Sequence, residues 1–88
     1  MALDRHLPTA DDVPWSETIT AYDEGHLLVY LRLLKMTKAD VSESIICREV
    51  LAIDPEREPD RARRAFDSHL KRARWMTERG FRELLKKN

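Results

Sequence analysis

Apolar residues recur with helical spacing along most of the chain, and this pattern predicts an all-α protein. The strongest signal lies in the stretch from Pro59 to Arg79, which we expect to form one long amphipathic helix. Pro59 suits the first turn of such a helix. The residues that would share its buried face are Ala62, Ala65, Phe66, His69, Leu70, Ala73 and Met76. Because His69 lies inside this face, we expect a hydrogen-bonded core histidine rather than a ligand.

A second helix is predicted from Asp23 to Met36, and it carries apolar residues on two faces. One stripe consists of Leu27, Tyr30, Leu31 and Leu34, and the other of Tyr22, Val29, Leu33 and Met36. Such a helix either lies at the centre of its domain or is buried on one side and binds a partner on the other. The central position is the interpretation we favour for so small a domain.

The other elements that the sequence predicts are shorter than these two helices. Asp40 and Glu43 have the spacing of a capping signature, so a helix is expected from about Val41 to Leu51. Ile53–Glu58 should be a loop, and residues 16–22 form either a short strand or the lead-in to a helix. The apolar residues Phe81, Leu84 and Leu85 suggest a short closing helix.

Residues 1–15 contain two prolines and are expected to be an extended N-terminal arm. The arm would either pack onto the domain or dock a partner, and packing is the interpretation we favour. The predicted fold is therefore a single small domain over residues 1–88, with three to four helices and an extended arm.

Composition excludes several classes of function. The two glycines lie far apart, so a phosphate-binding loop is absent, and the histidines and the single cysteine, Cys47, lack zinc-ligand spacing. We therefore expect no enzyme activity, no cofactor, no metal and no small-molecule ligand, with Cys47 acting as a small core residue. The longest stretch without a charged residue has seven residues, Gly25–Leu31, so no membrane span is expected. With no signal pattern either, the expected location is the cytoplasm.

Charge is divided unevenly along the chain although the total is zero. Residues 1–55 hold five basic and ten acidic residues (net −5), and residues 56–88 hold eleven basic and six acidic residues (net +5). A helix, a seven-residue connection (Ala52–Glu58) and a basic helix resemble a helix-turn-helix whose turn is extended beyond the usual 3–4 residues. The candidate DNA-binding residues are Arg57, Arg61, Arg63, Arg64 and Lys71. The alternative is a solvated face whose arginines are paired by local acids, for example Arg64 by Asp60 and Asp67.

Trp75 is the other unusual residue, because it falls on the polar side of the long helix. It must be covered or remain exposed. The structural interpretation is that the arm, with Leu7 and Trp15, or the closing helix folds over it. The functional interpretation is that Trp75 anchors a partner, since tryptophan and arginine dominate interface hot spots.

Four stretches of the chain resemble a family of small regulators encoded on bacterial integrative and conjugative elements. They are LDRHLPTADDVPW, TAYDEGHLLVYLRLL, IDPEREPDRARRAFDSHL and RARWMTERGFRELL, and the resemblance is weakest over residues 35–48. It implies a helix-turn-helix variant with an extended turn. In FseA-like transcriptional activators this domain is joined to an N-terminal partner domain, whereas QseM-like stand-alone members are antiactivators in the quorum-sensing control of conjugative transfer.

The chain has the length of the stand-alone type. The resemblance therefore implies an antiactivator that captures the N-terminal domain of an FseA-like activator, and a DNA-binding transcriptional regulator is the alternative. The residues expected to bind the protein partner are Leu7, Trp15, Tyr22, Val29, Leu33, Met36 and Trp75. DNA binding is less expected because the net charge is zero.

Overall fold

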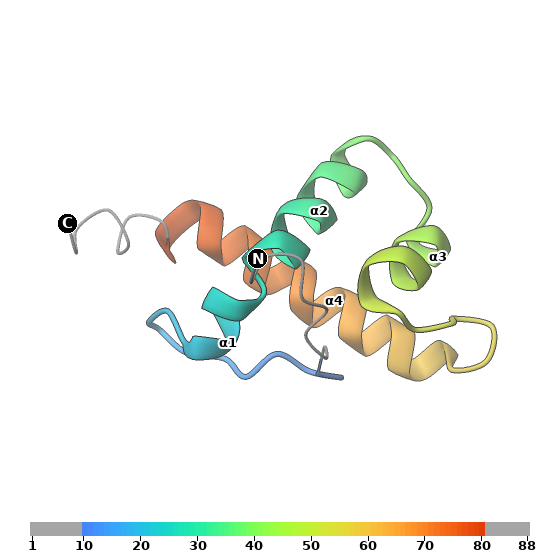
Figure 1. The fold of residues 1–88 in the computed structure, drawn as a ribbon, viewed down its shortest axis with the longest axis horizontal. Helices are drawn as coiled ribbons and strands as arrows, with labels where there is room; N and C mark the ends of the chain where they lie inside the picture. The colour runs from blue at the N-terminus through green and yellow to red at the C-terminus, as the bar shows by residue number, and fades with distance from the viewer. Residues whose placement is uncertain (1–9, 81–88) are drawn as a thin grey trace.

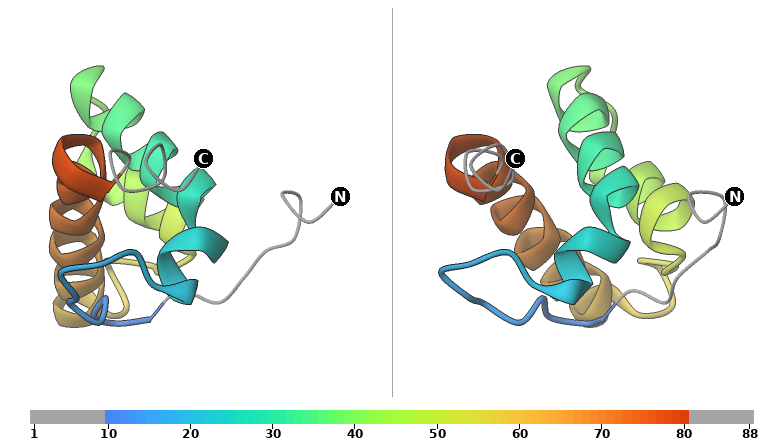
Figure 2. Two further views of the ribbon diagram at one scale, coloured as in Figure 1. Left: turned by 90° about the vertical axis from the view of Figure 1, so that its left-hand side faces the viewer. Right: turned by 60° about the vertical axis from the view of Figure 1, so that its left-hand side comes forward.

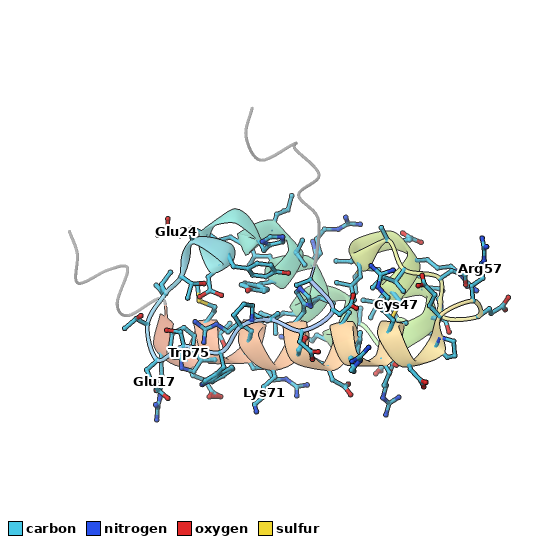
Figure 3. The ribbon with its side chains drawn as sticks, turned by 90° about the horizontal axis from the view of Figure 1, so that it is seen from below. Glu17, Glu24, Cys47, Arg57, Lys71 and Trp75 are labelled. Atoms are coloured by element: carbon cyan, nitrogen blue, oxygen red, sulfur yellow. The ribbon has the colours of Figure 1, made fainter. Side chains whose placement is uncertain are left out.

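The structure is a computed structural model that describes residues 10–80, and within this range it is all-α, as predicted. The elements are α1 (Ala21–Gly25), α2 (Leu27–Lys38), α3 (Glu43–Ile46), η2 (Cys47–Leu51), α4 (Pro59–Trp75) and η3 (Met76–Gly80). Figure 3 shows α4 as the base of the molecule, with α1, α2 and α3 on one side of it. The predicted closing helix and Leu7 lie outside the described residues.

The long helix confirms the sequence pattern. α4 begins at Pro59, and η3 extends it to Gly80. Every residue expected on its apolar face is buried, and His69 is fully buried with a hydrogen bond from its ring. This single face supports two clusters of the core. One cluster joins the first half of α4 to α2, α3 and η2, and the other joins its second half to Tyr30 of α2.

The helix predicted from Asp23 to Met36 is divided in two. Its start lies at Ala21, because Thr20 and Asp23 form a reciprocal capping box that the prediction missed. The helix then breaks at His26, whose φ of −122° and ψ of 21° end α1, and α2 continues to Lys38. Tyr22 is therefore helical, so the helix lead-in is correct for residues 16–22 and the strand is wrong.

The next helix begins two residues later than predicted. Ser42 caps it by accepting a hydrogen bond from the backbone N–H of Ile45, so Asp40 is not the cap. Asp40 has a φ of 60° and lies in the turn after α2. The predicted end at Leu51 is correct, and Ala52 follows it in the left-handed conformation.

α3 with η2, followed by α4, forms a helix-turn-helix pair with an extended turn (Figure 1). The connection spans Ala52–Glu58, as the sequence predicted. Asp54 stabilises it, because its side chain accepts from the backbone N–H of Glu56 and its carbonyl accepts from that of Glu58. Arg48 of η2 forms ion pairs with Asp54 and Glu56.

The arm predicted over residues 1–15 is described from residue 10, and the chain continues without regular secondary structure to residue 20 along α4 (Figure 2). From here on, the arm means residues 10–20. Its contacts advance along the helix in the same direction as the arm. Asp11 pairs with Arg61, the backbone N–H of Val13 donates to Ser68, and the ring of Trp15 meets that of Trp75. The arm thus packs onto the domain, which is the interpretation favoured from the sequence.

Candidate partner-binding surfaces

A buried ion pair fastens the arm and α1 to α4. The side chains of Asp23 and Arg72 are both fully buried, and the guanidinium binds the carboxylate through two hydrogen bonds of 2.6 and 3.0 Å. The Tyr30 hydroxyl and the backbone N–H of Thr20 donate to the same carboxylate at 2.8 and 2.9 Å. Burial acts to raise the pKa of Asp23, but the hydrogen bonds from Arg72, Thr20 and Tyr30 outweigh it and hold the pKa below the ordinary carboxyl value.

The remaining donors of Arg72 hold the arm. Its two terminal nitrogens donate to the carbonyl oxygens of Ser16 at 2.6 Å and Thr18 at 2.9 Å. The guanidinium also lies 3.9 Å from the ring centre of Trp75 and 4.9 Å from that of Trp15. Arg72 therefore has a structural role that uses both the fork of donors and the flat face of an arginine.

The rings of Trp15 and Trp75 contact each other next to the Arg72 guanidinium. Their ring centres are 6.1 Å apart in an edge-to-face arrangement, and Trp15 leaves Trp75 only 8% exposed. Trp15 itself remains 48% exposed, and Lys71 lies over its ring at 5.2 Å. This confirms that the arm covers Trp75.

A groove runs beside the tryptophans along the end of α4 (Figure 3, where Lys71 and Trp75 are labelled). Its lining mixes both charge signs with apolar surface. The lining residues are Trp15, Asp67, Leu70, Lys71, Arg74, Trp75, Glu78 and Arg79. We refer to these residues as the tryptophan groove. Only Trp15 among them is an apolar side chain with substantial exposure.

A second surface lies on α2, on the side opposite to its buried residues. Tyr30 and Leu33 are 2% and 0% exposed, whereas Leu28 and Leu31 are 47% and 54% exposed. A shallow, mostly apolar groove follows this side of the helix, lined by Leu28, Leu31, Arg32, Leu34, Lys35 and Lys38. We refer to Leu28, Leu31, Arg32, Lys35 and Lys38 as the α2 face. It joins the two exposed leucines to three cations.

The residues expected to bind a protein partner differ in how far they are exposed in the structure. Trp15 is exposed at the surface, and Trp75 lies beneath it. Tyr22, Val29 and Met36 are partly buried, and Leu33 lies wholly inside the core, so its expected place on a docking surface is wrong. The reason is the rotation of the helix: the buried side of α2 runs between the two predicted stripes, and Leu31 of the first stripe faces outward.

The partly buried Tyr22 belongs to a polar contact inside the fold. Its hydroxyl shares a hydrogen bond with Nε2 of His69 and accepts one from the backbone N–H of Ala10. Nδ1 of His69 donates to the carbonyl of Ala65 at 2.7 Å. Burial lowers the pKa of His69 and so favours the neutral ring, in which Nε2 accepts from the Tyr22 hydroxyl.

The candidate DNA-binding residues also separate into two groups. Arg61 pairs with Asp11 and Glu58, and Arg63 pairs with Glu43 and Asp67. Within residues 10–80, no ion pair forms at Arg57, Arg64 or Lys71. The predicted pairing of arginines with nearby acids is thus confirmed for Arg61 and Arg63. Asp67, however, pairs with Arg63 and not with Arg64 as predicted.

Sequence reasoning missed the α2 face and the Asp23–Arg72 pair. The capping spacing of Thr20 and Asp23 could have marked the start of α1, but no spacing connects Asp23 with Arg72, 49 residues away.

Cys47 behaves as predicted: it is buried against the carbonyl of Ala62, and burial raises the pKa of its thiol. Over the part of the chain that the structure describes, no group of three or more His, Cys, Asp and Glu side chains is placed to hold a metal ion. Within that same part, every helix is too short or too polar to span a bilayer.

The chain matches no protein-family model and no curated protein sequence.

Proposed function

We propose that this protein is a non-catalytic regulator that binds another protein, and specifically an antiactivator that captures the N-terminal domain of an FseA-like transcriptional activator in the bacterial cytoplasm. The observation that carries the proposal is the α2 face. Leu28 and Leu31 are half exposed on a helix whose other side already supplies the core. The sequence resemblance to QseM-like regulators supplies the identity of the partner.

The α2 face is suited to binding because the fold does not need it. Single exposed leucines are common on protein surfaces, but two leucines one helical turn apart along one groove form a continuous apolar strip. Covering that strip with a partner removes apolar area from water at no cost to the core. The two tryptophans, in contrast, already pack against each other and hold the arm on α4, and Trp75 is buried by this contact.

DNA binding is the second candidate, and one observation favours it. Arg57 lies in the extended turn and Arg64 in the first half of α4, both exposed and without ion pairs to described residues (Figure 3, where Arg57 is labelled). Two of the five candidate cations, Arg61 and Arg63, are however held by acids. Those acids reduce the positive field that phosphate binding requires, which places protein capture ahead.

The deciding experiment is a pair of binding titrations of the full chain. One uses the N-terminal domain of the activator from the same mobile element, and the other uses promoter DNA of that element at several salt concentrations. We expect saturable binding to the protein domain that Leu28→Ser and Leu31→Ser together weaken. Ile45→Ser is the matched control, because Ile45 is a similarly exposed apolar residue on α3.

Two outcomes would contradict the proposal. The first is an absence of binding to the activator domain at concentrations up to the solubility limit. The second is tight DNA binding that falls steeply with salt and is lost in Arg57→Glu and Arg64→Glu, which would make the extended turn and the start of α4 a DNA-reading surface.

A further inference from the structure

We propose that the α2 face receives one amphipathic helix of the partner, and that this helix carries glutamate or aspartate beside its apolar stripe. The inference rests on the proposed function, because it names the chemistry of the segment that the antiactivator captures. It is carried by the charge of α2 and by the arrangement of leucines and cations on its exposed side.

Charge complementarity is the first argument. α2 contains three cations, Arg32, Lys35 and Lys38, and no acidic residue. None of the three forms an ion pair with another residue in the 10–80 range, whereas Arg48, Arg61, Arg63 and Arg72 do. The cations of the α2 face are therefore available, and an acidic partner would be attracted and oriented by them.

The arrangement around the helix is the second argument. At 100° per residue, the five residues of the α2 face fall within about 120° of the helix circumference. Within this sector the leucines and cations alternate, in the order Arg32, Leu28, Lys35, Leu31, Lys38. A partner helix with apolar residues three and four positions apart can contact both leucines, and its acidic residues then meet the cations between and beside them.

The shape of the surface favours a helix over a flat lipid layer. The twelve residues of α2 extend over about 18 Å, or three turns. The strip between the cations is a shallow groove with the partly buried Leu34 at one side, which is a shape that accepts the ridge of another helix. A membrane-surface helix would instead require a broad apolar face opposite its cations, and on α2 that broad face is the one buried in the core.

The experiment uses two labelled helical peptides of equal length with the same leucine stripe, one with glutamates beside the stripe and the other with lysines. Each is titrated with the full chain at 0.15 M salt and followed by fluorescence anisotropy. We expect the glutamate peptide to bind at least about tenfold more tightly, with a preference that weakens as salt is raised.

Variants place the binding on the α2 face. Leu31→Ser should reduce affinity for the glutamate peptide by about fivefold or more, because a half-exposed leucine loses its contact. Lys35→Glu combined with Lys38→Glu should reverse the preference between the peptides. The matched controls are Ile45→Ser and Arg64→Glu, which change an exposed apolar residue and an unpaired cation elsewhere and should alter neither affinity nor preference. Circular dichroism verifies that each variant is folded.

Four results would overturn the inference. They are equal affinity for the two peptides, glutamate-peptide binding that survives Leu31→Ser, binding to anionic phosphatidylglycerol vesicles in place of the peptide, and a homodimer that Leu31→Ser dissociates. The last two would assign the α2 face to a lipid surface or to a second copy of the chain.

The activator domain, measured in parallel, separates this inference from the proposed function. If the domain binds and Leu31→Ser weakens the complex while Lys35→Glu with Lys38→Glu does not, capture stands and the acidic helix is wrong. If the glutamate peptide binds through the α2 face while the domain does not bind, the acidic helix stands and the identity of the partner is wrong.

Discussion

At the scale of single residues, the Asp23–Arg72 ion pair stands out because both of its side chains are fully buried. Removing one partner of a buried pair leaves an uncompensated charge away from water, at a cost of about 3–5 kcal/mol. We therefore expect Asp23→Ala to lower the free energy of unfolding by about that amount, measured by urea denaturation followed by circular dichroism. This is a large part of the total stability of a small domain.

Asp67→Ala is the control for this prediction, because the Asp67–Arg63 pair is exposed. Exposed pairs contribute about 0–1 kcal/mol. A second test replaces both buried partners, Asp23→Leu with Arg72→Met. The double variant should lose less free energy of unfolding than the sum of the losses in the two single variants. The prediction is wrong if Asp23→Ala destabilises the protein no more than Asp67→Ala.

His69 gives the protein a pH-dependent stability. Burial lowers its native pKa below the unfolded value of 6.5 and outweighs the hydrogen bond to the Ala65 carbonyl, which raises the pKa. Nearby His26 lowers the pKa further, whereas Asp12 raises it. Between the native pKa and 6.5 the unfolded chain binds more protons than the native protein, so stability rises with pH in this window. We expect the urea midpoint to be constant between about pH 7 and pH 8 and to decrease as the pH falls through 6.5 toward the native pKa.

The His69 prediction is checked by repeating the urea titrations with His69→Gln, which should lose stability overall but show a flatter dependence in that window. His26→Gln is the companion variant, because it keeps the buried His69. Asp23 does not interfere, since its lowered pKa confines its contribution to more acidic pH. An unchanged slope in His69→Gln would assign the pH dependence to another group.

At the scale of elements, sequence periodicity predicted helices well where one face is buried, and less well where local backbone geometry decides. α4 follows its pattern because every residue of its predicted apolar face is buried. α2 does not, because with two stripes the period alone leaves the rotation of the helix undetermined, and the buried side is set by contacts with α4 and η2. The break at His26 and the left-handed Asp40 depend on backbone conformations that apolar periodicity does not encode.

Ala52 shows how one such conformation affects an element. It ends η2 with a φ of 58°, a region that costs residues with a Cβ about 1–2 kcal/mol and glycine almost nothing. The neighbouring backbone N–H of Ile53 donates to the carbonyl of Cys47, so this conformation closes the helix. We expect Ala52→Gly to raise the free energy of unfolding by about 0.5–1 kcal/mol, measured by urea denaturation.

Ala39→Gly is the matched control for Ala52→Gly. Ala39 is also exposed and ends a helix, but its φ is −85°, so glycine relieves no strain there and adds only freedom to the unfolded chain. We expect Ala39→Gly to be neutral or destabilising. Equal effects of the two substitutions would mean that the left-handed conformation of Ala52 is not a source of strain.

At the scale of the whole molecule, the arm and α4 act as one unit although 50 or more residues separate their contacts in the sequence. The sequence suggested that Trp75 needs a cover and that Trp15 could supply it. It could not show that Arg72, placed by its spacing on the polar side of the helix, becomes buried beneath both rings. Burial of an arginine requires partners from distant segments, here Asp23 of α1 and two carbonyls of the arm.

Trp15→Ala tests this coupling, because Trp75 then becomes the sole tryptophan and reports on its own cover. Loss of the edge-to-face ring contact and of the contact with Arg72 should lower the free energy of unfolding by about 1–2 kcal/mol. Opening the cover should also shift the native fluorescence of Trp75 to longer wavelength. Trp15→Phe is the control, since it keeps a ring over Trp75 and should leave the emission at shorter wavelength. If both variants emit alike and are equally stable, then the arm does not need Trp15 to stay on α4, and its polar contacts with Arg61, Ser68 and Arg72 hold it there.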